Sequence, residues 1–206
     1  MYYIEIIGLS LWIAFWAGYI WSTLSIGTKS VLFGAHCFFL HPWFMAAAWT
    51  KLYGYPFDPR LWIAFFVHDL GYVGQPNMDG PEGERHVEWG AELMGALFGE
   101  KWYEFCLYHS RHYAKMYDAT PSRLCFADKL AFCYQIKPLY LWMTRLTGEL
   151  DEYLKNAKYW NNYSGTIAPG RWYDDLFIWI REYVTVHKDG AADHITVDRR
   201  KTDSIY

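Results

Sequence analysis

The chain has 206 residues and a formal net charge of −3, a size that suits one globular domain with a full hydrophobic core. Without a basic stripe of Lys and Arg, this charge excludes the electrostatic surface of a nucleic-acid-binding protein, so we expect no nucleic-acid polymer as a partner. The four cysteines, Cys37, Cys106, Cys125 and Cys133, lack C-x-x-C spacing. This predicts reduced core thiols in a cytosolic domain, with no disulfide framework and no zinc–thiolate site.

The first element along the chain is a run without charged side chains at residues 6–28. It is long enough to cross a bilayer core of about 30 Å as a helix. A secretory signal is not indicated, because Glu5 precedes the run and no A-x-A cleavage site follows it. Lys29 and Arg60 follow the run, so the positive-inside rule predicts that residues 6–26 anchor the protein to a membrane, with the next domain on the cytoplasmic face.

The same run permits a second interpretation. Trp12 and Trp16 lie in its interior, whereas a spanning helix gathers its aromatic residues near the two membrane interfaces. In this interpretation the helix packs on the domain that follows and covers the mouth of its pocket. We divide the chain into an N-terminal apolar helix at residues 1–29, a helical domain at residues 30–187 and a polar tail at residues 188–206.

Prolines mark the starts of several predicted helices. Proline is favoured at the first helical position, where its missing N–H needs no partner, and Pro42, Pro59 and Pro121 fit this position. The predicted helices lie at residues 42–53, 58–69, 84–98, 101–117, 120–137, 139–159 and 171–186. A loop dense in turn residues occupies positions 74–83. No alternating strand pattern appears, so the predicted fold class is all-α.

Several of these helices place His or Asp among apolar side chains at helical spacing. These residues are His68 and Asp69 after the run LWIAFFV, His86, His109 and His112 on two later helices, and Asp128 among Leu124, Ala127 and Ala131. A single buried His is commonly a satisfied core residue, but an unpaired buried Asp costs roughly several kcal/mol or a large pKa shift. A shared cation explains them together, and imidazole with carboxylate suits Zn, Fe, Mn, Ni or Co.

The order His…His-Asp…His…His…Asp resembles the HD superfamily of metal-dependent phosphohydrolases. The resemblance covers residues 35–135, about half of the chain. It is carried by FFVHDLGY at 65–72, RHVEWGAELM at 85–94, YHS at 108–110 and CFADKLAF at 125–132. The dipeptide HD is a weak signal by itself, but these segments together are specific. The resemblance implies an HD-domain helical bundle with bound divalent transition metal.

The resemblance implies the following site residues. His68, Asp69 and Asp128 match metal ligands, together with His41, which caps the first domain helix; His36 is its rival. His86 and His109 match the additional ligands of the two-metal subset, with Asp69 bridging the two ions. We assign catalytic roles to Asp69, to Lys129 beside a ligand, and to His112, which contacts the substrate or replaces His109 from one turn away.

The chain departs from the family pattern at one position. Many members have Lys where this sequence has Tyr72, in the motif HDxGK, and that Lys helps to bind phosphate. Arg85, Arg111 and Lys115, with Lys129, are the candidates to supply the missing positive charge. We therefore expect Tyr72, Arg85, Arg111 and Lys115 to contact the substrate.

Two functions fit these residues. The first is a phosphohydrolase that acts through a metal-activated water on a small phosphorylated metabolite or a nucleotide. The second is a di-iron oxygenase that cleaves a C–H or C–P bond with O2, as a minority of HD proteins with six His and Asp ligands do. The sequence Ala-Asp-Lys-Leu follows the hydrolase pattern, so we favour the hydrolase. A degenerate domain that only binds a ligand is less attractive, because no ligand position has been lost.

Overall fold

The computed structural model describes residues 2–161 and 167–191. In this part of the chain helices are the regular elements and no β-strand forms, which confirms the all-α class. The α-helices are α1 (Tyr2–Thr23), α2 (Ile26–Phe33), α3 (His41–Tyr53), α4 (Pro59–Val67), α5 (His86–Phe98), α6 (Glu100–Leu107), α7 (Arg111–Met116), α8 (Arg123–Ala131), α9 (Lys137–Thr147), α10 (Glu149–Asn161) and α11 (Pro169–His187). Short 3-10 helices are η1 (Leu70–Tyr72), η2 (Gly83–Arg85), η3 (Phe132–Tyr134) and η4 (Lys188–Gly190). Most of the predicted tail, at 192–206, lies outside the described residues.

The N-terminal run forms two helices. α1 ends at Thr23 and α2 begins at Ile26, because the side chain of Ser25 caps α2 by accepting a hydrogen bond from the N–H of Thr28. The prediction of a membrane anchor at residues 6–26 is wrong: among the described residues, no helix is both long and apolar enough to cross a membrane. The run lacks charge, but its many Trp, Tyr, Ser, Thr and Gly residues supply little of the hydropathy that Leu, Ile, Val and Phe provide.

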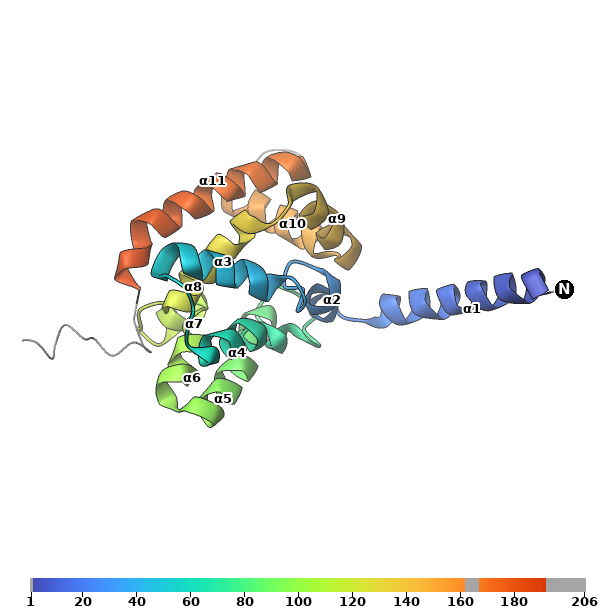
Figure 1. The fold of residues 1–206 in the computed structure, drawn as a ribbon. Coiled ribbons are helices and arrows are strands. Elements are labelled where there is room, and N and C mark those ends of the chain that lie inside the picture. Colours follow the sequence, from blue (N-terminus) through green and yellow to red (C-terminus); the bar gives the residue numbers. More distant parts are fainter. Residues whose placement is uncertain (1, 162–166, 192–206) are drawn as a thin grey trace, which may run out of the picture.

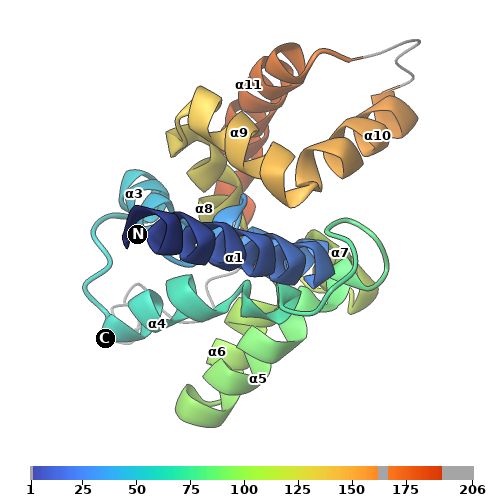
Figure 2. The same ribbon diagram turned by 90° about the vertical axis from the view of Figure 1, so that its right-hand side faces the viewer.

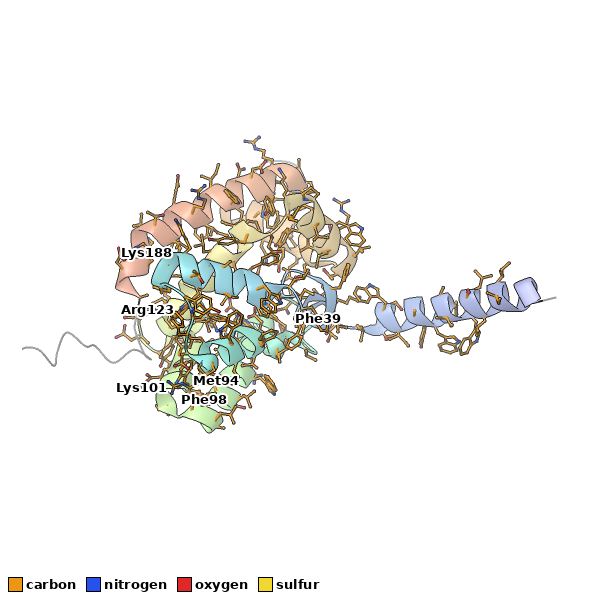
Figure 3. All side chains as sticks on the ribbon, viewed as in Figure 1. Phe39, Met94, Phe98, Lys101, Arg123 and Lys188 are labelled. Atoms are coloured by element: carbon orange, nitrogen blue, oxygen red, sulfur yellow. The ribbon has the colours of Figure 1, made fainter. Side chains whose placement is uncertain are left out.

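α1 also leaves the mouth of the pocket uncovered. It points away from the other helices in Figure 1, and in Figure 3 its side chains have no other helix beside them. The large apolar side chains at residues 6–20 are exposed, Trp12 to 61% and Phe15 to 67%. The second interpretation of the run, a helix packed on the domain, is therefore not what the structure shows.

The remaining helices form tiers on either side of α3 and α8, which pack against each other (Figures 1 and 2). On one side α4, α5 and α6 enclose a core around Trp49, Phe65 and Phe105. On the other side η3, α9 and α11 enclose a core around Phe132 and Tyr173. α8 contributes to both cores. Its residues are thus fixed from two directions, which makes it a rigid support for a functional side chain.

Two of the predicted long helices are interrupted. The helix expected at 101–117 is divided into α6 and α7, because the Ser110 side chain accepts hydrogen bonds from the N–H groups of His112 and Tyr113 and starts a new helix. The helix expected at 139–159 is divided at Gly148, whose φ of +91° favours glycine. Each interruption redirects the chain. The first keeps His109 buried and leaves His112 exposed.

Candidate metal centre

Four side chains from three parts of the chain converge between α3, α4 and α8. His41 opens α3, His68 and Asp69 follow α4, and Asp128 lies on α8. Asp69 Oδ2 lies 3.0 Å from His68 Nε2 and 3.4 Å from His41 Nε2, and Asp128 Oδ1 lies 3.1 Å from His41 Nε2. One ligand atom from each of the four lies within 4.8 Å of every other. This spacing suits a single ion with mixed imidazole and carboxylate ligands.

A second group shares Asp69. Its other oxygen, Oδ1, lies 3.6 Å from His86 Nε2 and 3.5 Å from His109 Nε2. The two imidazole Nε2 atoms lie 3.2 Å apart. These three residues form a second set able to hold a metal ion. Asp69 therefore belongs to both sets.

Backbone carbonyls fix the orientation of three of the imidazoles. His86 Nδ1–H donates to the carbonyl of Gly83 at 2.7 Å, and His109 Nδ1–H donates to that of Cys106. His68 Nδ1 faces the carbonyls of Ala64 and Phe65, each at 3.2 Å. With the hydrogen on Nδ1, each ring turns its Nε2 atom toward the site. Metal-ligating histidines are commonly held in this way.

The site also contains buried polar atoms that have no hydrogen-bond partner among the described residues. They are Nδ1 and Nε2 of His41, Nε2 of His68 and Oδ2 of Asp69. Such atoms are rare in proteins and call for a physical explanation. The Nε2 atoms of His86 and His109 also face each other at 3.2 Å, although the Nδ1 atom of each ring already donates to a backbone carbonyl. A cation bound at each set resolves both features, so the residues fit a metal.

The buried carboxylates and imidazoles set one another's protonation states. Burial lowers the pKa of His68, but the charges of Asp69 and Asp128 outweigh it and raise the value to about 10, so His68 must release a proton when a metal binds. Burial by itself raises the pKa of Asp69 and of Asp128, but the imidazoles around them, His68 among them, outweigh this effect and hold both values well below the usual range. Burial and the nearby His109 lower the pKa of His86 to about 3. The carboxylates are thus anionic and His86 is neutral at pH 7, as metal binding requires.

A cavity of about 670 Å³ opens onto this cluster. Asp69, His86, His109 and Asp128 form part of its wall, whereas His41 and His68 are not among the lining residues. Of the residues predicted to contact the substrate or to take part in catalysis, Tyr72, Arg111, His112, Lys115 and Lys129 also line it. The cavity therefore adjoins the His86 set most directly.

Two predicted site residues are placed elsewhere. The Arg85 guanidinium pairs with Glu88 at 3.1 Å and does not line the cavity. His36 lines the cavity but belongs to neither metal set among the described residues. His41, the alternative candidate for the first ligand, belongs to the set with His68 and Asp128. The Nδ1 of His36 lies 2.9 Å from Ser30 Oγ and 3.7 Å from Glu149 Oε1.

Glu149 is a residue that sequence reasoning missed. Its side chain is fully buried, yet in the sequence it begins the acidic stretch ELDE, a pattern typical of an exposed first helical turn. Glu149 packs against Gly34, where an added Cβ would meet Glu149 Oε2 at 1.9 Å. That contact links segments far apart in the chain, so no local pattern shows it.

No protein-family model, curated protein or solved structure matches this chain. The assignment of the site therefore rests on the residues themselves, on the distances between them and on the unpaired atoms that they bury. These observations identify a buried cluster of His and Asp able to bind metal ions.

Proposed function

We propose that this chain is a metal-dependent phosphohydrolase of the HD type, acting on a small phosphorylated metabolite or a nucleotide. The observation that carries the proposal is the pair of metal sets joined through Asp69 at the wall of a cavity that is also lined by cations. Metals in such sets supply an activated water and neutralise charge on phosphoryl oxygens. His41, His68, Asp69 and Asp128 would hold one ion, and Asp69, His86 and His109 the other.

The cationic side chains beside the metal sets support an anionic substrate. Arg111 and Lys115 come from α7 and Lys129 from α8, next to Asp128. Arg111 is held by aromatic rings, since its guanidinium carbon lies 5.1 Å from the centre of the Tyr183 ring. We infer that these cations orient a phosphate toward the metal sets. They replace the Lys that the HD pattern has at Tyr72.

A di-iron oxygenase is the second candidate. Six His and Asp residues in two sets that share a carboxylate favour it, and so does the Tyr at position 72, which stacks on His86 with ring centres 4.0 Å apart. In this case the substrate loses a C–H or C–P bond and O2 is consumed.

One experiment separates the two candidates. Purified protein is analysed for bound metals, then reconstituted with Mn, Fe, Co, Ni or Zn and assayed with nucleotides and sugar phosphates. We expect phosphate release that needs metal and is lost in Asp69→Asn. Iron as the bound metal, with O2 uptake and no phosphate release from any substrate, would select the oxygenase instead.

A further inference from the structure

A second buried carboxylate lies outside both metal sets. Glu149 begins α10, and its side chain is 0% exposed. It accepts hydrogen bonds from Ser30 Oγ at 2.6 Å, from the N–H of Ala35 at 3.2 Å, from Thr147 Oγ1 at 2.5 Å and from Tyr153 Oη at 3.2 Å. A buried carboxylate with this many donors is held in one orientation.

His36 is attached to this carboxylate through Ser30. The Ser30 hydroxyl donates to Glu149, so its oxygen is left to accept from His36 Nδ1–H at 2.9 Å. The Nδ1 of His36 also lies 3.7 Å from Glu149 Oε1. The hydrogen bond through Ser30 fixes the ring and places its hydrogen on Nδ1. Glu149 is close to the imidazole and both groups are largely buried, so it favours the charged ring, which carries a hydrogen on Nε2 as well as on Nδ1.

The ring of His36 faces the substrate space. It lines the cavity together with Tyr72, and the centres of these two rings are 4.7 Å apart. Tyr72 in turn stacks on the metal-set residue His86. Because the Nδ1 edge of His36 is occupied by Ser30 and Glu149, the Nε2 edge is the one left for the cavity. His36 stands in the segment between α2 and α3, whereas the other cations come from α7 and α8.

We propose that His36 is a further substrate-binding residue, whose Nε2–H donates a hydrogen bond to a phosphate oxygen, and that Glu149 and Ser30 are its positioning residues. The proposal rests on the proposed function in one respect, namely that the substrate carries phosphate. It explains why Glu149 is buried with a full set of hydrogen-bond donors beside His36, which belongs to neither metal set among the described residues. Such an arrangement offers a fixed donor in a partly dry cavity.

Two substitutions of His36 test the roles of its Nδ1 and Nε2 atoms separately. His36→Asn keeps a donor near the Nδ1 position, toward Ser30, and removes the Nε2 edge. His36→Gln extends a donor toward the Nε2 position and gives up the contact with Ser30. Binding of inorganic phosphate to the metal-loaded full chain is measured by titration calorimetry. Metal content and melting temperature are measured on the same samples.

We expect His36→Asn to weaken phosphate binding by roughly tenfold or more, the loss of one hydrogen bond to a charged group, with metal content unchanged. His36→Gln should recover part of that loss. Ser30→Ala, which leaves the ring in place without its acceptor, should show a smaller loss and provides the test if the His36 variants do not fold. Wild-type affinity in both His36→Asn and Ser30→Ala would overturn the proposal and leave the proposed function intact.

Two other outcomes count against it. Loss of bound metal in His36→Asn would make His36 a metal ligand and overturn its role as a substrate contact. Absence of phosphate binding in metal-loaded wild-type protein would instead overturn the proposed function, and the phosphate contact with it.

Discussion

The chain buries two carboxylates beside histidines, Asp69 and Glu149, and surrounds them differently. Glu149 accepts four hydrogen bonds from neutral donors, whereas Asp69 Oδ2 has no hydrogen-bond partner among the described residues although His68 Nε2 is 3.0 Å away. A fully satisfied carboxylate needs nothing more from its surroundings. A buried carboxylate oxygen without a hydrogen-bond partner favours a bound cation. Burial alone therefore does not separate a positioning residue from a metal ligand; the count of satisfied atoms does.

The largest expected effect follows from the place of Asp69 in both metal sets. Asp69→Ala should reduce metal binding by orders of magnitude at both sets and abolish activity, because each ion loses a carboxylate ligand. His68→Ala should act in the same direction at the first set. Helical content, followed by circular dichroism, should stay largely intact. Full metal occupancy in Asp69→Ala, measured by elemental analysis, would show that the open lone pairs of Asp69 serve another purpose.

A smaller effect is expected at the second set. His86→Ala or His109→Ala should lower the stoichiometry of loaded protein from two ions per chain to one, because the His41 set keeps all four of its ligands. The same titration on Glu149→Gln provides the control and should give the wild-type ratio. A ratio near one in the wild type, unchanged by either substitution, would leave His86 and His109 with structural or substrate-contacting roles.

Glu149 should respond in the opposite way from Asp69. Glu149→Ala removes a buried acceptor and leaves donors from Ser30, Ala35 and Thr147 without their partner, so we expect a loss of about 3–5 kcal/mol in the free energy of unfolding. Urea denaturation measures this value, and metal content should stay at the wild-type level. Loss of metal from Glu149→Ala without loss of stability would show that Glu149, like Asp69, serves metal binding.

The smallest expected effect is a change with pH in the stability that Glu149 supplies. Burial raises the pKa of Glu149, but the nearby His36 imidazole, followed by the hydrogen bonds from Ser30 and Thr147, outweighs it and lowers the value from the ordinary 4.5. The stability that the carboxylate supplies is thus fully present above pH 4.5 and is lost as the pH falls through the lower folded value. In metal-free protein, the stability difference between wild type and Glu149→Gln should narrow below pH 4.5. A stability difference that widens below pH 4.5 would show that folding raises the pKa of Glu149 instead of lowering it.

Much of the candidate site could be predicted from sequence, because its residues lie at positions with local signals. His41 precedes a helix-starting proline, His68 and Asp69 end an apolar run, and Asp128 stands among Ala and Leu on one helix face. The structure brings these four together, and it brings His86 and His109 to Asp69. Helical periodicity indicated that His86, His109 and Asp128 face the interior, whereas His41 was predicted only through the resemblance to the HD pattern.

The rest depends on contacts between distant segments. Nothing near Glu149 in the sequence shows that Ser30 and Ala35 donate to it. The division of the predicted helix at 101–117 depends on the Ser110 cap, which competes with continued helix. Arg85 has a charge suited to phosphate but pairs with Glu88, its neighbour one helical turn along the chain. For the uncharged run at 6–28, absence of charge was mistaken for apolarity.

The central claim is that His41, His68, Asp69, His86, His109 and Asp128 hold two metal ions. A crystal structure of the full chain loaded with Mn²⁺ or Fe²⁺, with anomalous scattering recorded at the metal edge, tests it most directly. We predict two anomalous peaks roughly 3.5–4 Å apart, one on each side of the Asp69 carboxylate. Metal-loaded crystals with no peak within bonding distance of Asp69 would contradict it.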